Sequence, residues 1–202
     1  LDDINYICDY LLHGGDAETF RERFQGALSD GFDPDVHLRS LGVANQTTML
    51  KSETEEIQKR VREAIESRDG NTENFSVFDT ICGATQERQD ALFELLKKSM
   101  NLLLVVGGYN SSNTTHLVEI GEKELPTFFI RSAQCIVSLE EIIHYDLHLK
   151  EEVSAYSAVF GNEDPIVVGI TAGASCPSNL IEETILKVFE LRGIDADTVR
   201  AV

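Results

Sequence analysis

The sequence predicts an α/β fold built on parallel β-strands, and three observations lead to this prediction. Short apolar segments alternate with longer amphipathic segments along most of the 202 residues. The loops between them are short and rich in Gly, Ser, Asn and Thr, which is typical of strand–turn–helix units. The segment 102–106, LLLVV, is apolar throughout, as expected for a central strand of a parallel sheet that is covered on both faces.

The first part of the chain predicts a helix, a strand and a second helix. Residues 16–30 are amphipathic, and Gly31 follows them at a position where glycine commonly ends a helix. A strand over 41–44 leads through a polar turn into the second helix, and the polar loop 68–74 is the best candidate for a domain boundary. The two apolar helix faces consist of Phe20, Phe24, Ala27 and Leu28, and of Ile57, Val61, Ala64 and Ile65.

The rest of the chain predicts further units of the same kind and one less regular stretch. Residues 131–164 form that stretch, with a helix expected near 138–150 and then a surface loop that ends at Asp164-Pro165. His144 and His148 would lie four apart on that helix, with no third metal ligand evident nearby, so we interpret them as surface or packing residues. Strands are expected at 75–81, 102–106, 127–130 and 166–170, and the last helix at about 177–191.

The charge and composition of the chain exclude several classes of function. Thirty-five acidic and seventeen basic residues give a net charge of −18. Such a chain repels phosphate backbones and anionic lipid, so we expect neither a nucleic-acid nor a membrane partner. No segment approaches the roughly 18 apolar residues of a membrane span, and the acidic first ten residues do not resemble a signal peptide. The first residue is not Met, which indicates a processed chain or a fragment.

Polar residues cluster where predicted strands end and helices begin. Ligands of parallel α/β sheets bind at the carboxyl ends of the strands, and a helix N-terminus offers unpaired backbone N–H groups to an anion. Residues 111–113 add two hydroxyls and an amide at such a point, and Gly107-Gly108 allows close approach to the main chain. This combination suits a diphosphate. The candidate ligands at these junctions are Thr47, Thr48, Ser111, Ser112, Asn113 and Ser175.

The same polar residues also have a purely structural interpretation. Ser112 or Asn113 can be the N-cap of its helix, a role that contributes about 1 kcal/mol. The same holds for Ser175 and for the Thr47-Thr48 pair. Spacing alone leaves the two interpretations open.

Cys82 lies at the end of a predicted strand and at the start of a helix. A helix N-terminus favours the thiolate, the form that binds metal or acts as a nucleophile, although a lone cysteine can equally be a small buried residue. One thiolate cannot hold an iron–sulfur cluster, which normally has about four ligands. The four cysteines, at 8, 82, 135 and 176, form no CxxC pair and are too few for a disulfide scaffold, which favours a reducing compartment.

Four strings carry a resemblance to a known family. They are ANQTTM at 44–49, DTICGATQERQDAL at 79–92, VVGGYNSSNTTHL at 105–117 and VGITAGASCP at 168–177. In this order and at these separations they resemble the 4-hydroxy-3-methylbut-2-enyl diphosphate reductase family, also called the LytB family. They are most similar to its plastid and cyanobacterial branch. The likeness covers nearly the whole chain and is weakest over 131–164.

The resemblance implies three similar α/β domains around a central [4Fe–4S] cluster, with one cysteine ligand from each domain. Residues 1–78 would then be a remnant of the middle domain, and residues 79–202 the third domain. The family's first two cluster cysteines, its three substrate-binding histidines and its proton-donating glutamate are expected upstream of this chain, so no catalytic acid is expected within it. The residues that match family positions are Cys82 as the last cluster thiolate, Ser111, Ser112, Asn113 and Ser175 as diphosphate ligands, and Thr47 as a pocket residue, with Thr48 a weaker candidate.

The implied reaction is the two-electron reduction of (E)-4-hydroxy-3-methylbut-2-enyl diphosphate to isopentenyl and dimethylallyl diphosphates. The resemblance further implies a ferredoxin as electron donor and a location in the plastid stroma or the cyanobacterial cytoplasm. With one matched ligand of three, we expect the isolated chain to be inactive. Two alternatives stay open: a non-catalytic α/β module that binds a phosphorylated metabolite, and a different enzyme with Cys82 as nucleophile.

Overall fold

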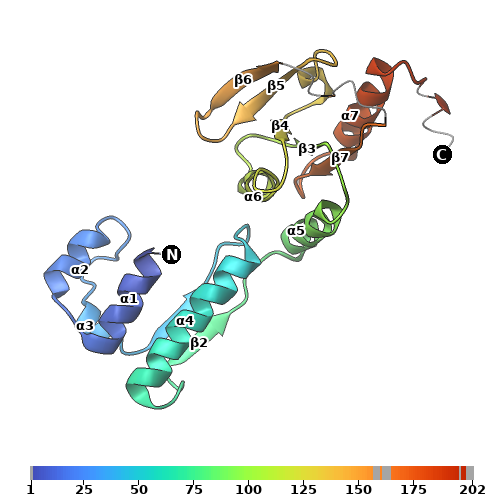
Figure 1. Cartoon of the computed structure of the whole chain (residues 1–202). Helices are drawn as coiled ribbons and strands as arrows, with labels where there is room; N and C mark the ends of the chain where they lie inside the picture. Colours follow the sequence, from blue (N-terminus) through green and yellow to red (C-terminus); the bar gives the residue numbers. More distant parts are fainter. Residues whose placement is uncertain (1, 157–159, 161–164, 196, 199–202) are drawn as a thin grey trace. The chain divides into compact units, whose positions relative to one another are not determined.

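The computed structural model describes residues 2–156, 160, 165–195 and 197–198 of the chain. The chain divides into two compact units, which we call unit 1 (Leu1–Ile81) and unit 2 (Cys82–Val202). Each unit is an assembly of helices around short strands (Figure 1). Residues 68–74, the best boundary candidate in the sequence, lie within unit 1, where they form the end of its longest helix and the loop before its second strand.

Unit 1 is a β–α–β unit with three helices added before it. Strands β1 (Leu41–Ala44) and β2 (Phe75–Phe78) pair in parallel, with Leu41 opposite Phe75 and Ala44 opposite Phe78. Helix α4 (Lys51–Asp69) connects them, and Val61, Ala64 and Ile65 of its predicted apolar face are buried. The three preceding helices are α1 (Asp2–His13), α2 (Ala17–Arg23) and α3 (Pro34–His37).

Helix α2 is shorter than the sequence predicted. Asp16 begins it, since its carboxylate accepts hydrogen bonds from the N–H of Thr19 at 2.7 Å and the hydroxyl of Thr19 at 2.8 Å. The helix ends at Arg23, and Gly26 then adopts a left-handed backbone with φ +85°. Because glycine adopts that conformation at no steric cost, Gly26 favours a turn, and residues 24–30 of the predicted helix are not helical. Phe20 still reaches the core, whereas Ala27 is exposed.

Unit 2 contains a three-stranded parallel sheet in the order β4-β3-β7, formed by β3 (Leu102–Val106), β4 (Thr127–Ile130) and β7 (Val168–Ala172). Val106 lies opposite Ile130 on one side and opposite Ala172 on the other, so the three strands end together. The parallel sheet confirms the predicted fold class. The helices of the unit are α5 (Gly83–Leu96), α6 (Ser112–Gly121) and α7 (Ser178–Leu191).

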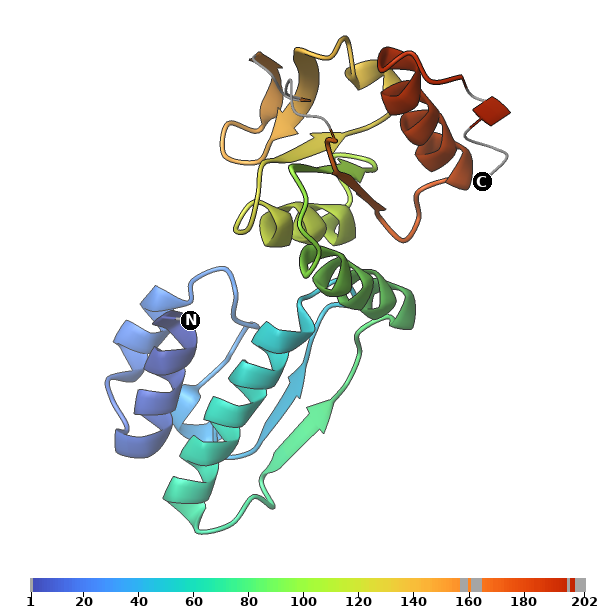
Figure 2. The same ribbon diagram turned by 45° about the vertical axis from the view of Figure 1, so that its right-hand side comes forward.

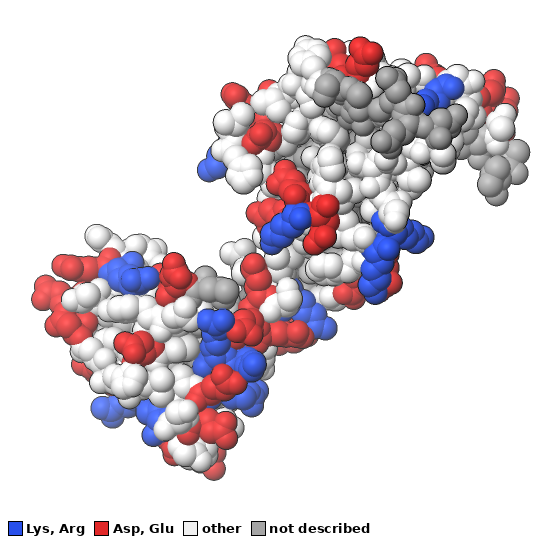
Figure 3. Space-filling view, in the orientation of Figure 1, with Lys and Arg blue, Asp and Glu red and all other residues white. Residues whose placement is uncertain are grey.

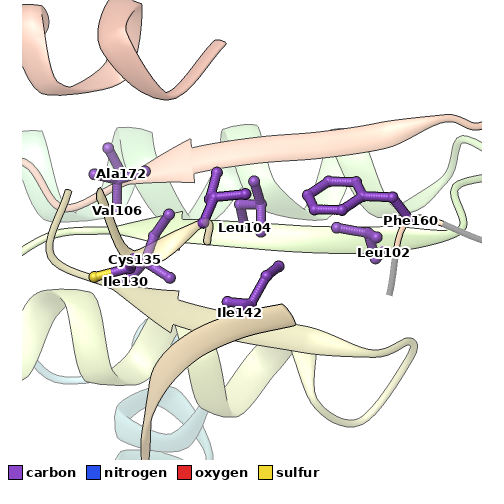
Figure 4. Packing of buried hydrophobic residues seen from close by; sticks show 9 residues of the cluster. Leu102, Leu104, Val106, Ile130, Cys135, Ile142, Phe160 and Ala172 are labelled. Atoms are coloured by element: carbon purple, nitrogen blue, oxygen red, sulfur yellow. The ribbon is translucent and has the colours of Figure 1, made fainter. Parts of the chain in front are cut away.

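The central strand β3 forms the core of unit 2, as its apolar sequence predicted. Its five residues are at most 1% exposed. Leu102, Leu104 and Val106 belong to the cluster that α7 also enters, with Phe160 beside Leu102 at one end of the row and Ala172 beside Val106 at the other (Figure 4). Leu103 points to the opposite face, where it contacts Gly121 of α6. Helices α6 and α7 therefore cover opposite faces of the sheet (Figure 2).

The prediction of a helix near 138–150 is wrong. This stretch is an antiparallel hairpin of β5 (Glu141–Asp146) and β6 (Glu151–Tyr156). The hairpin follows the short 3₁₀ turn η1 (Ala133–Cys135). Ile142, Ile143 and Tyr145 favour an extended chain. The carboxylate of Asp146 accepts hydrogen bonds from the N–H groups of residues 148 and 149 at 2.7 and 2.8 Å and closes the turn.

The hairpin also changes the interpretation of the two histidines. His144 lies on β5, and its ring meets that of Phe128 edge to face at 5.1 Å, while His148 lies in the turn. They share no helix face. Burial lowers the pKa of His144, which fits a packing residue. Residues 161–164, where the predicted surface loop ends at Asp164, lie outside the described residues.

Acidic side chains occur over both units and are interspersed with Lys and Arg on the face that Figure 3 shows. This distribution agrees with a solvated surface rather than a single charged tail. Within the described part of the chain, no helix is long and apolar enough to cross a membrane.

The packing of β3 predicts a large cost for a cavity at its centre. Leu104 is fully buried, so Leu104→Ala should lower the free energy of unfolding of unit 2 by about 2–5 kcal/mol. Leu149→Ala is the matched control, since that side chain is 62% exposed, and it should change stability by less than about 0.5 kcal/mol. Amide hydrogen exchange of β3 measures both. Equal effects of the two variants would contradict the assignment of β3 as the core.

Candidate functional site

The ends of β3 and β7 bring two predicted polar segments to one edge of the sheet. Because the strands are adjacent and parallel, with Val106 opposite Ala172, the loops that follow them leave the sheet side by side. The first loop leads from Gly107 into α6, and the second leads from Gly173 into α7. We call the two segments, residues 107–114 and 173–178, the strand-end site.

Thr114 joins the two halves of the strand-end site. It lies in the first turn of α6 and is 1% exposed. A methyl group at Gly107 would lie 2.8 Å from the Thr114 Oγ1, and one at Gly173 would overlap the same atom. Both glycines are therefore needed so that α6 can pack its first turn against the two strand ends.

Ser111 is the N-cap of α6, a role that the structural interpretation of the sequence gave to Ser112 or Asn113. The Ser111 Oγ accepts hydrogen bonds from the Thr114 N–H at 3.4 Å and from the Thr114 hydroxyl at 3.0 Å. Ser112 is the first residue of the helix and is exposed. Neither Ser112 nor Asn113 is the cap, so that structural explanation of these two residues is wrong.

Asn113 has a buried polar atom that lacks a partner. Its side chain is 7% exposed, and its Oδ1 is buried without a hydrogen bond to any described residue. A buried polar group in this condition costs about 1–3 kcal/mol. Rotation of the carboxamide by 180° exchanges oxygen and nitrogen, so the same position can present N–H groups to an anion. The observation points to a ligand at the first turn of α6.

Ser175 lies in a turn that follows β7 and is exposed. The turn is closed by a hydrogen bond from the N–H of Cys176 to the carbonyl of Gly173 at 2.9 Å. Pro177 is the N-cap of α7, and the helix has no side-chain cap. Ser175 is therefore not the N-cap, and its hydroxyl lies at the same edge of the sheet as residues 111–113.

Tyr109, which was not among the residues predicted from the sequence, holds the first loop of the strand-end site against the hairpin. Its hydroxyl donates to Glu152 Oε1 at 3.0 Å, and its ring stacks on Tyr145 with centroids 4.7 Å apart. Burial, together with the nearby Cys135, raises the pKa of Tyr109. The aromatic residues of the loop and of the hairpin were visible in the sequence, but their pairing depends on a hairpin that was predicted as a helix.

Cys82 is the N-cap of α5, as the strand-to-helix junction predicted, and its side chain makes no capping bond. All four cysteines are described and free: Cys82 is exposed, Cys135 is buried, and Cys8 and Cys176 are half-buried. Burial raises the pKa of Cys8 and of Cys176, which disfavours their thiolates. Cys82 is thus the thiol most open to a metal. Among the described residues, no group of three or more His, Cys, Asp or Glu side chains could hold a metal ion.

Thr47 and Thr48 lie in the turn between β1 and α4 in unit 1. Helix α4 begins after Leu50 and has no side-chain cap, so the capping pair that the structural interpretation offered is wrong. Thr80, after β2, ties the two strand ends together, since its hydroxyl donates to the carbonyl of Asn45 and accepts from the N–H of Asn45 at 3.1 Å. The role of Thr47 as a pocket residue stays a prediction.

A cavity of about 370 Å³ in unit 1 is a rival anion site, because Arg39 and Arg68 are among the residues that line it. The Arg68 guanidinium, however, pairs with Asp69 at 2.7 Å and donates to the carbonyls of Leu38 and Arg39, each at 2.9 Å. Asp35 lines the same cavity as a further carboxylate. The arginine charge is largely matched there, so the cavity is better explained as a structural feature.

The close fit around Thr114 predicts that Gly173 tolerates no side chain. Gly173→Ala should lower the stability of unit 2 by about 1–3 kcal/mol, because the new methyl group overlaps a buried hydroxyl. Gly108→Ala is the control, since a methyl group there meets no atom within 4 Å. Thermal unfolding compares the two. A Gly173→Ala protein as stable as the Gly108→Ala protein would show that the first turn of α6 does not pack as described.

Comparison with known proteins adds to this geometry. The 4-hydroxy-3-methylbut-2-enyl diphosphate reductase of Gloeobacter violaceus is 48% identical over an alignment of 198 residues, which covers 96% of this chain and 47% of that protein. The enzyme of the same name from Microcystis aeruginosa is 48% identical over an alignment of 196 residues, which covers 95% of this chain and 48% of that protein. The chain therefore spans about half the length of these relatives.

Among solved structures, the E-1-hydroxy-2-methyl-but-2-enyl-4-diphosphate reductase from Plasmodium falciparum matches with a TM-score of 0.52 at 20% identity. The match covers 74% of this chain and 39% of that one, and it supports the α/β fold. The LytB protein family matches residues 16–189, a range that includes Cys82 and both segments of the strand-end site. By this match the chain belongs to the LytB protein family.

Proposed function

We propose that the chain is the C-terminal part of an iron–sulfur reductase that converts (E)-4-hydroxy-3-methylbut-2-enyl diphosphate to isopentenyl and dimethylallyl diphosphates. The relatives that are 48% identical carry the name of that reductase. The observation that carries the proposal for this chain is the strand-end site, where residues 111–113 and Ser175 lie at one edge of the sheet and the Asn113 Oδ1 lacks a partner among the described residues.

The proposed task of the strand-end site is to hold the diphosphate. The first turn of α6 presents backbone N–H groups and the positive end of the helix dipole, which together attract an anion. The hydroxyls of Ser111, Ser112 and Ser175 and the amide of Asn113 add donors. Gly108 leaves space above the main chain, since a methyl group there would meet no atom within 4 Å. An uncharged cradle of this kind binds phosphate oxygens without Lys or Arg.

The proposed cofactor is a [4Fe–4S] cluster, of which this chain would hold one ligand. Cys82 fits that role because its thiol is exposed and lies at a helix N-terminus. When bound, such a cluster supplies a Lewis-acidic iron for the substrate hydroxyl and a path for two electrons. The other two cysteine ligands and the proton donor would come from outside residues 1–202, which is why we propose that the chain alone is inactive.

The domain arrangement belongs to the same proposal. Residues 1–78 would be a remnant of the middle domain and residues 79–202 the third domain of a three-domain protein, with Thr47 as a pocket residue from the middle domain and Thr48 as a weaker one. A ferredoxin is the proposed electron donor, in a plastid stroma or a cyanobacterial cytoplasm. The net charge of −18 opposes docking of an acidic ferredoxin, so the docking surface would require local basic residues.

A second candidate is a non-catalytic module that binds a phosphorylated metabolite. One observation favours it: the strand-end site lies entirely within unit 2, whereas Cys82 is one thiol without further metal ligands among the described residues. The two candidates differ in whether Cys82 is needed for a reaction.

A chimaera tests the reductase proposal. This chain should be able to replace the matching part of the Gloeobacter violaceus enzyme, since the two are 48% identical over an alignment that covers 96% of this chain. After anaerobic reconstitution, the chimaera should contain about four iron atoms per chain and reduce the substrate with a reduced viologen dye as electron source. Cys82→Ser should remove activity and most of the iron, because one cluster ligand is lost.

The matched control in the chimaera is Cys8→Ser, which changes a half-buried thiol of α1, outside the strand-end site. It should keep the iron and most of the activity. The chain alone, treated in the same way, should show no turnover. An active Cys82→Ser chimaera would contradict the ligand assignment, and a stoichiometric cluster with turnover in the chain alone would contradict the proposal that it needs an upstream half.

A further inference from the structure

We infer that Thr114 is a positioning residue of the diphosphate site: its buried hydroxyl holds Ser111 so that the Ser111 O–H can only donate outward, to an anion. The inference rests on the proposed function, because it takes the strand-end site as the place where the diphosphate binds. In this inference Thr114 does not itself contact the diphosphate and acts only through Ser111.

Thr114 is fixed in place by its packing. Its side chain is 1% exposed and fills the space above both Gly107 and Gly173, so it cannot move without opening the strand-end site. Gly107 directly follows β3, Gly173 directly follows β7, and these two strands pair with each other. Thr114 therefore also sets the separation of the two loops that carry Ser111 and Ser175.

The Ser111 hydroxyl has a limited capacity for hydrogen bonds. A hydroxyl has one proton to donate and two positions at which it accepts. Both accepting positions of the Ser111 Oγ are filled, by the N–H of Thr114 at 3.4 Å and by its hydroxyl at 3.0 Å. What is left is the Ser111 proton. A deprotonated phosphate oxygen only accepts hydrogen bonds, so the remaining capacity of Ser111 matches a phosphate and excludes a ligand that can only donate.

The positioning role of Thr114 differs from ordinary helix capping. Capping of α6 needs only the bond from the Thr114 N–H to Ser111. The second bond, from the Thr114 hydroxyl, adds nothing to the satisfaction of backbone groups. It does polarise the Ser111 hydroxyl, because an oxygen that accepts two hydrogen bonds becomes a better donor in a low-dielectric environment. If Thr114 served only to pack α6 against the strand ends, its bulk would be needed but its hydroxyl would not.

Three variants of the chain separate bulk from hydroxyl. Thr114→Val keeps the shape and removes the hydroxyl, Thr114→Ser keeps the hydroxyl, and Thr115→Val makes the same chemical change one residue further along α6. Isothermal titration with inorganic diphosphate measures affinity, and thermal unfolding measures the fold. Thr114→Val should weaken diphosphate binding about 3- to 10-fold, the effect of one neutral hydrogen bond. Thr114→Ser and Thr115→Val should bind within about 2-fold of the unchanged chain.

A double-mutant cycle with Ser111→Ala tests whether Thr114 acts through Ser111. In the Ser111→Ala background, Thr114→Val should cause no further loss, so the two effects should not add. Additive losses would overturn the inference, as would a Thr114→Val chain that binds like the unchanged one. If Thr114→Val fails to fold, Thr114→Ala replaces it, compared with Thr114→Ser. An unchanged chain that does not bind diphosphate would overturn the proposed binding site itself, and the inference with it.

Discussion

The parallel pairing of β3 with β7 is the constraint on which the rest of unit 2 depends. It places Gly107 and Gly173 side by side, and the absence of side chains there lets Thr114 bring the first turn of α6 against both strand ends. The helix then presents Ser111, Ser112 and Asn113 at the edge where the loop with Ser175 also leaves the sheet. The polar residues of the strand-end site are thus positioned by an apolar strand, β3, that is buried on both faces.

Much of this fold could be predicted because its signals are local. The apolar run of β3 and the 3.6-residue periodicity of α4 specify their elements within a few residues of sequence. Helix α1 was not predicted, although Ile7, Tyr10 and Leu11 have helical spacing and pack in the core. The hairpin was predicted as a helix because the alternation over 141–146 is short, and the turn that reverses the chain depends on one side chain, Asp146.

The residues of the candidate site could likewise be predicted only in part. The rule that ligands bind at the carboxyl ends of parallel strands was enough to select residues 111–113 and Ser175 from the sequence. It could not identify the N-cap as Ser111 or show that Asn113 is buried, because both depend on the exact start of α6. Thr114 and Tyr109 escaped notice because their roles depend on contacts with Gly173 and Glu152, which are distant in the sequence. The proposed role of Cys82 as a cluster ligand would require further ligands that unit 2 does not supply among its described residues.

The central claim is that an anion binds at the paired ends of β3 and β7 through neutral donors. The most direct test is a two-dimensional ¹H–¹⁵N NMR titration of the chain with inorganic diphosphate. The account predicts that the largest amide shift changes fall in residues 107–114 and 173–178. Changes centred instead on the cavity that Arg39 and Arg68 line would show that charge, rather than the strand-end site, selects the ligand, and would contradict the account.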